Sequence, residues 1–481
     1  MSRTSSHTLK NVNGILVLCL VVLVAGWLIL PRIDALLPDS MLMPSVRYVE
    51  LVAGKSADTI IDRIMGETRI QLSHHAAAVM VVERAGITAV ALFVTLASCL
   101  LLVFRYREGA KPINGTLTLV LIIVNGTLIR LLLAYMCYGN FDMKSWEIAA
   151  DIATRGGNIY AESDRYTTSP VWFLIIGALK WVQLNVTDFE FHFVLRSFLT
   201  AIDLLTCLCL CFIAAREGTA PAAVALLYYL NPVTFLLTGY HGQFENIALL
   251  MLLIGIASCY RFKDRPVLSG VFLWSFATLG LISKHNVLCQ FVSCVDAATR
   301  DTWRKLILIA LSFALFGATF IPYWQKGSEG IIRYVFLYAS SPGVYGITSL
   351  VDLGVLKYLF MIGAVVFPLL LRGDDVVEHC MISGLFFLVF TTGIGVQYFV
   401  LPIAFAALRP SKEFLIYTIV TTMFLLGSPV NLATPGFNAL RINVVWMAAV
   451  YWFVVALSAG NVFRFRGVLS RQRDRVAHVP E

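Results

Sequence analysis

The recurrence of long apolar stretches is the feature that most constrains how this chain folds. Many stretches run for about 15 to 24 residues, close to the length with which an α-helix crosses the hydrocarbon core of a bilayer. Of the 481 residues, 58% are hydrophobic and only 14% are charged, and the mean hydropathy is +0.79. A soluble domain carries about a quarter charged residues. The sequence therefore predicts an all-α, polytopic transmembrane protein and excludes a soluble enzyme, a disordered scaffold and a nucleic-acid-binding protein.

The apolar runs predict about 14 spans with both termini in the cytosol. The first run, Gly14 to Leu30, follows Arg3 and Lys10 and has no small-residue cleavage site after it, which indicates a signal anchor. The remaining runs are 86–104, 116–136, 192–214, 219–238, 246–260, 267–283, 286–299, 305–323, 348–371, 378–393, 397–409, 413–428 and 443–461.

Basic residues decide the orientation. With 14 spans, 20 of the 37 Lys and Arg residues fall in cytosolic segments such as Arg261–Arg265 and Arg300–Lys305, whereas the short outer loops hold 8. The net charge of +8 is therefore an orientation signal. One further apolar run, Val171 to Val182, would reverse every later loop if it crossed the membrane. We therefore expect residues 170–186 to form a juxtamembrane helix that begins and ends on the outer side.

With this topology, the polar, aromatic and Gly-rich segments gather on the outer side. Polar groups near the membrane boundary are costly unless they face a cavity or pair with one another. Their convergence predicts one site assembled at the outer membrane surface. The segments are 138–151, 155–170, 231–232, 239–246, 283–286, 333–346, 397–398 and 438–441.

Several of these residues also have purely structural interpretations. Asp142 could only cap a helix, Met143–Arg155, that Gly156-Gly157 ends. Glu147 and Asp151, four apart, could be the solvated face of that helix.

Candidate residues later in the sequence also have purely structural interpretations. His241 could be a satisfied core histidine, and Lys284-His285 could be a span end whose lysine snorkels. Arg196 and Asp203, seven apart on one helix face, could pack or form an internal pair. The C-x-C-x-C run 207–211 spreads its thiols around a helix and does not favour a tetrahedral metal site.

The order of the polar segments carries a resemblance to a known family. Asn140-Phe141-Asp142 supplies an acidic residue in the first outer loop of the module, and Gly156-Gly157-Asn158-Ile159-Tyr160 and Tyr166-Thr167-Thr168-Ser169-Pro170 follow. Gly239-Tyr240-His241-Gly242-Gln243-Phe244-Glu245-Asn246 is close to an H-x-(H/Q)-F-(D/E/Q)-x-N element, and Ser283-Lys284-His285 comes after it. In this order, over residues 116–310 and more loosely to 461, the chain resembles the GT-C glycosyltransferases. The closest likeness is to the branch that uses polyisoprenyl-phosphate sugars, which includes mannosyltransferases of lipid-linked glycans.

The resemblance implies inverting transfer of a hexose, with mannose as the first expectation, from a polyprenyl- or dolichyl-phosphate sugar to a glycan or glycolipid acceptor. Such a reaction needs a carboxylate at the acceptor hydroxyl and positive charge at the departing phosphate. The candidate base is Asp142. The candidates for the donor phosphate are Lys284, His285, Arg441 and Arg333, and those for the sugar or acceptor are Glu147, Tyr166, Tyr240, His241, Gln243, Glu245 and Tyr398.

The same resemblance divides the chain into three parts. Residues 1–115 form a two-span extension with an outer loop, 31–85; residues 116–310 form the GT-C-like catalytic module; and 311–481 supply helices that complete the site. Lys144 stands where many members carry a second acidic residue, so the resemblance does not carry over a divalent metal, and no cofactor is assigned.

The expected location is a bacterial inner membrane, or the endoplasmic reticulum membrane in a eukaryote, with the active site on the extracytoplasmic side. The expected partners are the lipid-linked donor, the acceptor and the bilayer. Two other functions stay open, namely a polysaccharide polymerase or ligase and a lipid-linked sugar transporter. A transporter predicts charged residues near mid-span and an internal repeat, and no repeat is visible.

Overall fold

The computed structural model describes residues 3–36, 46–47, 74–106, 115–337, 354–427 and 451–464. Within these ranges the chain is helical and contains no strand, which confirms the predicted all-α class. Residues 48–73 of the expected outer loop 31–85, the cluster 338–346 and the candidate Arg441 lie outside the described residues.

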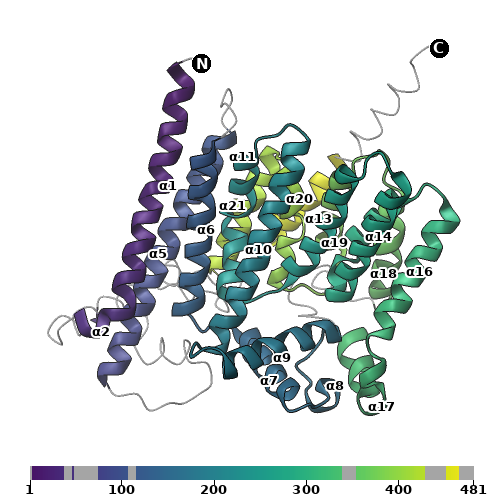
Figure 1. The fold of residues 1–481 in the computed structure, drawn as a ribbon, viewed down its shortest axis with the longest axis horizontal. Coiled ribbons are helices and arrows are strands. Elements are labelled where there is room, and N and C mark those ends of the chain that lie inside the picture. The colour runs from purple at the N-terminus through teal and green to yellow at the C-terminus, as the bar shows by residue number, and fades with distance from the viewer. Residues whose placement is uncertain are drawn as a thin grey trace.

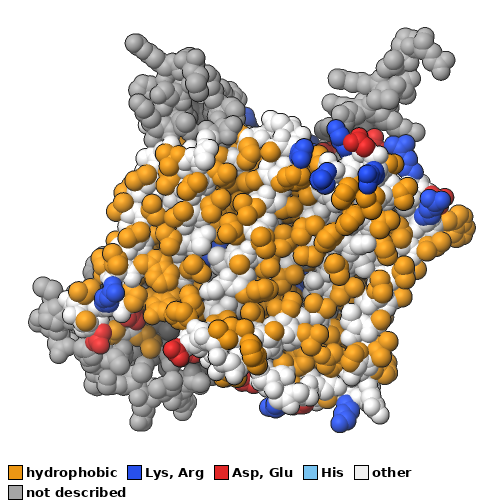
Figure 2. Space-filling view, viewed as in Figure 1, with side chains coloured by type: hydrophobic (Ala, Val, Ile, Leu, Met, Phe, Trp, Pro, Cys, Tyr) orange, Lys and Arg blue, Asp and Glu red, His pale blue; other side chains and the backbone are white. Residues whose placement is uncertain are grey.

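Within the described residues, five helices are long and apolar enough to cross a membrane, which identifies a membrane protein. Their apolar windows have mean hydropathies between 1.6 and 2.8, and the windows lie in the segments Asn11–Leu36, Ala78–Phe104, Thr116–Met136, Phe191–Arg216 and Pro266–Ser283. Figure 2 shows a broad apolar band across one face, with Lys and Arg side chains gathered along its upper edge. The helices are α1 (Arg3–Ile29, continued by η1, Leu30–Arg32, and α2, Ile33–Leu36), α5 (His74–Tyr106), α6 (Thr116–Met136), α10 (Phe191–Arg216) and α14 (Pro266–Ser283).

The run 219–238, expected as one span, is broken. It forms α11 (Pro221–Tyr228), α12 (Pro232–Leu236) and the π-helical turn η2 (Leu237–His241), with a bend of 48°. The break has a local cause, because Pro232 has no N–H to donate and Asn231 caps the new helix by accepting from the N–H of Val233. This discontinuous segment ends among the polar residues 239–246.

The run 305–323 is also longer and bent rather than one straight span. Helix α16 (Thr302–Ala318) turns by 79° into α17 (Ile321–Gly330) and the π-helical η4 (Ile331–Phe336). Counting each bent pair as one span gives up to seven candidates among the described residues, below the 14 runs that hydropathy suggested.

Shorter helices fill the rest of the bundle. They are α13 (Glu245–Arg261), η3 (His285–Val287), α15 (Leu288–Ala298), α18 (Leu356–Leu369), α19 (Val376–Phe390), η6 (Val396–Val400), α20 (Ile403–Leu408) and α21 (Lys412–Gly427).

Three helices lie across one end of the bundle. They are α7 (Phe141–Thr154), α8 (Ile159–Glu162) and α9 (Pro170–Asn185), and α17 joins them by packing on α8 (Figure 1). Helix α9 packs on α7, outside the bundle of long helices, in the segment for which we expected a juxtamembrane helix. We call this end the α7 end.

The opposite end is the one where α1 begins (Figure 1), and we call it the basic end because Lys and Arg side chains gather along that edge in Figure 2. Arg409 there bridges Glu217 at 2.6 Å and Asp375 at 2.7 Å, and so ties α20 to the loops after α10 and before α19. Helix α13 runs from Glu245 at the α7 end to Arg261 at the basic end.

The N-terminal extension, which includes α1 and α5, packs directly on α6 rather than standing apart from it. Asn125 of α6 donates to the carbonyl of Leu16 in α1 at 3.0 Å, and Thr118 donates to Asn13 at 2.7 Å. Helix α5 contacts α1, α6, α11 and α12. The extension therefore reaches the broken segment that leads to the α7 end.

Candidate functional site

The start of α7 is capped by Asn140, not by Asp142 as one interpretation of the sequence had it. The Asn140 side-chain oxygen accepts from the N–H of Asp142 at 3.2 Å, and the helix begins at Phe141. It ends at Thr154, before Gly156, whose φ of +71° is the left-handed conformation that commonly terminates a helix. Because Asn140 takes the capping role, the Asp142 carboxylate is released from it.

Asp142 is held instead by two amide donors. Gln243 donates to Oδ2 of Asp142 at 2.5 Å, and Asn140 donates to the same oxygen at 3.2 Å. Among the described residues, Oδ1 accepts no hydrogen bond, and the side chain is only partly buried. The carboxylate is thus fixed through one oxygen and keeps the other available.

Asn140 also reaches His241. Its amide nitrogen lies 2.7 Å from Nδ1 of His241, and because an amide N–H can only donate, Nδ1 is the acceptor and the imidazole carries its proton on Nε2. Three predicted residues, Asp142, His241 and Gln243, therefore belong to one hydrogen-bonded group. Gln243 contacts Asp142 directly, and Asn140 links Asp142 to His241.

The backbone that presents these residues is held by a buried arginine. Arg196 of α10 donates to the carbonyls of Gly239 at 3.2 Å and Tyr240 at 2.9 Å, and to those of Ala134 and Cys137 at the end of α6. Carbonyls at the C-terminal end of a helix have no intrahelical hydrogen-bond donor, and leaving them without a donor in apolar surroundings costs free energy. Arg196 thus fixes the ends of two helices side by side.

Gly242 then turns the chain toward α7. Its φ of +66° is the left-handed region, and a Cβ there would lie 2.5 Å from the end of the Met143 side chain. Glycine is therefore favoured between His241 and Gln243 by the backbone conformation, whereas the Met143 side chain is flexible and could shift to make room for a Cβ.

A buried ion pair lies two residues further along. Lys284 Nζ is 3.1 Å from Oε1 of Glu245, and the side chains are 5% and 1% exposed. The same ammonium lies 3.8 Å from the centre of the Phe244 ring. The expectation that Lys284 could snorkel is therefore wrong, because its charge points into the protein.

His285 adjoins this pair on η3. Its Nδ1 is shut off from solvent and has no hydrogen-bond partner among the described residues. Burial, together with the neighbouring positive charge of Lys284, lowers the pKa of His285 to about 4, so the imidazole is neutral at pH 7.

An aromatic cluster underlies both groups. The rings of Trp172 and Phe244 stack at 4.0 Å, and Trp146 meets Trp172, Phe244 and Tyr166 edge-on. Tyr166 is 1% exposed and its hydroxyl donates to the carbonyl of Ser169 at 2.7 Å. These ring contacts pack α7 and α9 against the segment 243–245, and Tyr166 is part of this packing.

Glu147 lies further along α7, partly exposed. Its carboxylate accepts from the Tyr138 hydroxyl at 2.7 Å and lies 3.6 Å from Lys144, whereas Asp151 turns to Lys180 at 3.3 Å. Burial and the hydrogen bond to Glu147 raise the pKa of Tyr138, so the phenol stays a donor.

Two other predicted residues are not brought into this group. Arg333 is exposed on η4, where its guanidinium lies over the Tyr334 ring. Tyr398 lies on η6, with its ring edge-on to Phe387.

Tyr240 meets a residue from the N-terminal extension. Arg84 of α5 donates to the Tyr240 hydroxyl at 3.1 Å and to the sulfur of Cys137 at 2.8 Å, and its guanidinium lies over the Tyr240 ring. Nothing in the sequence distinguished Arg84, because it lies near the start of a long apolar helix with no motif around it.

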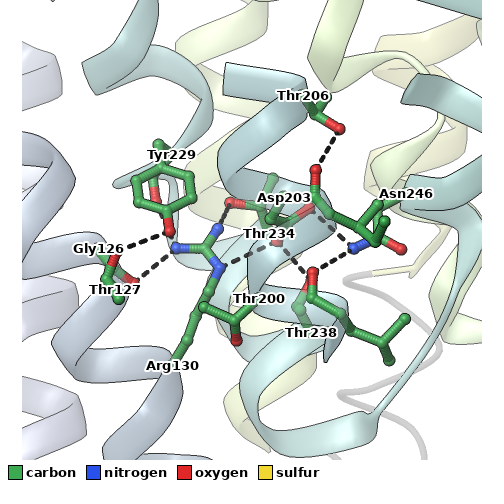
Figure 3. A network of polar contacts seen from close by, with 12 residues as sticks. Gly126, Thr127, Arg130, Thr200, Asp203, Thr206, Tyr229, Thr234, Thr238 and Asn246 are labelled. Carbon is green, nitrogen blue, oxygen red and sulfur yellow. Dashed lines mark hydrogen bonds and ion pairs between the residues drawn. The ribbon is translucent and has the colours of Figure 1, made fainter. Parts of the chain in front are cut away.

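A second buried network lies near the broken segment (Figure 3). Arg130 of α6 pairs with Asp203 of α10 at 2.9 Å, and both side chains are fully buried. The same guanidinium donates to the carbonyls of Gly126 and Tyr229 at 2.9 and 2.7 Å and to the Thr234 hydroxyl at 3.0 Å. Arg130 therefore satisfies a carbonyl that the break between α11 and α12 leaves open.

Asp203 is equally saturated. It accepts from the Tyr228 hydroxyl at 2.9 Å, the Thr238 hydroxyl at 2.7 Å and the Asn246 amide at 3.1 Å, in addition to Arg130. The internal pair suggested between Arg196 and Asp203 is thus wrong: seven residues on one helix put them two turns apart, Asp203 pairs with Arg130 of α6, and Arg196 donates to backbone carbonyls, those of Gly239 and Tyr240 among them.

No group of three or more His, Cys, Asp or Glu side chains within the described ranges is arranged to hold a metal ion. Comparison with protein-family models, with curated proteins and with solved structures gave no match.

Proposed function

We propose that this protein is a multi-pass membrane glycosyltransferase that transfers a hexose from a polyisoprenyl-phosphate sugar to an acceptor hydroxyl with inversion. The sequence resemblance favours mannose as the hexose. The observation that carries the proposal is the contact between Asp142, at the start of α7, and Gln243, just after the broken segment. The contact draws together the first and the second half of the ordered motif series at one end of the bundle.

The proposed reaction assigns one role to Asp142. The acceptor hydroxyl attacks the anomeric carbon, the bond from that carbon to the phosphate oxygen breaks, and the polyisoprenyl phosphate leaves with the electron pair. Oδ1 of Asp142 takes the hydroxyl proton, while Gln243 and Asn140 hold Oδ2. A general base that is anchored through one oxygen keeps its orientation toward the acceptor.

The proposed phosphate position is near Lys284 and His285. Gln243 contacts Asp142, and Glu245 contacts Lys284. The Cα atoms of Gln243 and Glu245 are two residues apart and so no more than about 7 Å from each other, which keeps the proposed base and the proposed phosphate site close together. A lipid donor reaches such a site from the bilayer, where its phosphate lies at the boundary.

The orientation belongs to the same proposal. The loops that hold Arg261, Arg300 and Arg409 are at the basic end, and basic loops face the cytosol in most membrane proteins. The α7 end would then be extracytoplasmic. The charged pair deep in the bundle, Arg130 with Asp203, is saturated by fixed partners, which favours an enzyme over a transporter that needs an exchangeable charge there.

The test is transfer by the purified protein in nanodiscs. Polyprenyl-phosphate mannose, glucose and arabinose are offered in parallel with nucleotide sugars. We expect transfer only from the lipid-linked donors, and a loss of about 100-fold or more in Asp142→Asn, the size of a general-base contribution.

Asp151→Asn is the matched control. It makes the same change on the same helix, at an exposed residue paired only with Lys180. Activity within twofold of wild type is expected for this control. An Asp142→Asn variant that is folded and keeps most of its activity would remove Asp142 from the base role.

A further inference from the structure

The two fully buried ion pairs of the described chain differ in how completely they are satisfied. The contact between Arg130 and Asp203 has hydrogen-bond geometry, and the acid accepts four hydrogen bonds in all. Glu245 and Lys284 are also buried, yet neither carboxylate oxygen of Glu245 has a hydrogen-bonding partner among the residues that the structure describes. The first pair is built as a fixed structural element, and the second is not.

The Lys284 ammonium has donors to spare. It carries three N–H groups, and its described neighbours are Oε1 of Glu245, at an ion-pair distance of 3.1 Å without hydrogen-bond geometry, and the face of Phe244. A buried charge that is paired but poorly hydrogen-bonded costs several kcal/mol that the attraction barely repays. The carboxylate of such a pair is therefore weakly held, and an anion that accepts hydrogen bonds from the ammonium can replace it.

We propose that Glu245 occupies an anion position at Lys284 in the ligand-free protein and yields it to the phosphate group of an incoming lipid ligand, which is a diester while it carries the sugar and a monoester once the sugar has left. The inference rests on the proposed function for the identity of that ligand, a polyisoprenyl phosphate. A phosphate group keeps at least two unesterified oxygens in either form, and an ammonium donates strong, charge-assisted hydrogen bonds to such oxygens. The neighbouring neutral imidazole of His285 offers a ring nitrogen that has no described partner.

The exchange gives Glu245 a definite role. With Glu245 in place, Lys284 is neutralised and the buried site does not hold a bare positive charge. When phosphate replaces it, the released carboxylate can accept from a hydroxyl of the bound sugar, the role that the sequence resemblance gave Glu245. Affinity for the phosphate is therefore lowered by the competing internal anion.

The experiment measures binding of farnesyl phosphate to the full-length protein in nanodiscs, with farnesol and inorganic phosphate as parallel probes. Wild type is compared with Glu245→Gln, with Lys284→Gln and with the double variant. We expect Glu245→Gln to bind farnesyl phosphate on the order of tenfold more tightly, which corresponds to about 1.4 kcal/mol of removed competition. Lys284→Gln and the double variant should lose this gain, and farnesol binding should be equal in all four proteins.

Two further variants serve as a control and as a conservative substitution. Glu217→Gln breaks a contact to Arg409 at the basic end and should leave all affinities unchanged. Glu245→Asp keeps the charges balanced but shortens the acid by one methylene, so it should fold even if Glu245→Gln does not and should show a smaller gain. Unchanged or weaker farnesyl phosphate binding in the folded Glu245 variants would overturn the exchange, as would a gain that survives Lys284→Gln.

The probes separate the sources of the phosphate and the two proposals. An equal gain for inorganic phosphate supports exchange at the phosphate group alone, and a gain confined to farnesyl phosphate supports exchange with the lipid as part of the ligand. If affinity follows the expected pattern but no sugar is transferred from any donor, the exchange stands and the proposed function fails. If sugar is transferred but Glu245→Gln does not tighten binding, only the exchange fails.

Discussion

Replacing Asp203 by alanine should destabilise the protein strongly, because the acid is the centre of the network in Figure 3. The change removes the acceptor for Arg130, Tyr228, Thr238 and Asn246 at once. It also leaves a buried guanidinium without a counter-charge, and breaking one partner of such a pair costs about 3–5 kcal/mol. Most of that cost comes from the stranded charge rather than from the lost bonds.

A second substitution separates the two contributions. In the double variant Asp203→Ala with Arg130→Met, the unpaired charge is gone, so stability should recover in part. Recovery should be incomplete, because the Tyr229 carbonyl at the break between α11 and α12 loses its donor, a cost of about 1–3 kcal/mol. The expected order of stability is therefore wild type, then the double variant, then Asp203→Ala.

The assay is the free energy of unfolding from SDS titration in mixed micelles, with helix content and elution volume recorded for each variant. Asp296→Ala is the control, since Asp296 pairs with Lys305 at a partly exposed position of the basic end. It should cost no more than about 1 kcal/mol. A loss below 1 kcal/mol in Asp203→Ala, or a double variant less stable than Asp203→Ala, would refute the reasoning.

Two further predictions concern packing and orientation. Gly239→Ala should cost about 1–3 kcal/mol in the same titration, because its Cβ would lie 2.8 Å from the Cα of Arg130; Gly317→Ala, with nothing within 4 Å of its Cβ, should be near neutral, and equal losses would contradict this. In intact cells, Lys144→Cys should react with an impermeant maleimide and Lys263→Cys only after permeabilisation, because both positions are exposed, at the α7 end and the basic end, and no native cysteine is exposed among the described residues. The reverse labelling pattern would overturn the proposed orientation.

Hydropathy predicted where helices form better than where they break. The run 192–214 is a single helix, Phe191–Arg216, as expected. The run 219–238 is interrupted, because an average over apolar residues does not register that Pro232 removes a backbone donor. Pro322, at the first turn of α17, accompanies the second bend in the same way. Pro232 and Pro322 mark the two bends in the sequence, and an average of hydropathy over the run does not use them.

Partners across helices were beyond the sequence. Spacing on one helix suggested that Arg196 and Asp203 belong together, but their partners lie on α6 and on the broken segment. The pairing of Glu245 with Lys284 joins the start of α13 to the end of α14, and the antiparallel packing of neighbouring helices that brings them together leaves no trace in local periodicity. By contrast, the proximity of Asp142 and Gln243 is what an ordered motif series would produce if its segments share one site.

Three buried arginines fix the segment that leads to Gln243, the residue that holds Asp142. Arg130 holds the break at Tyr229, Arg196 holds the carbonyls of Gly239 and Tyr240, and Arg84 reaches in from the N-terminal extension to the Tyr240 hydroxyl. The residues of this segment that the arginines contact all precede Gln243 in the sequence, and Gln243 donates to the proposed base, Asp142. The opposite side, from Glu245 to Lys284, has one under-bonded ion pair. Under the proposed function this difference is what the chemistry requires, since the base must keep one geometry whereas the anion site must release one phosphate and accept the next.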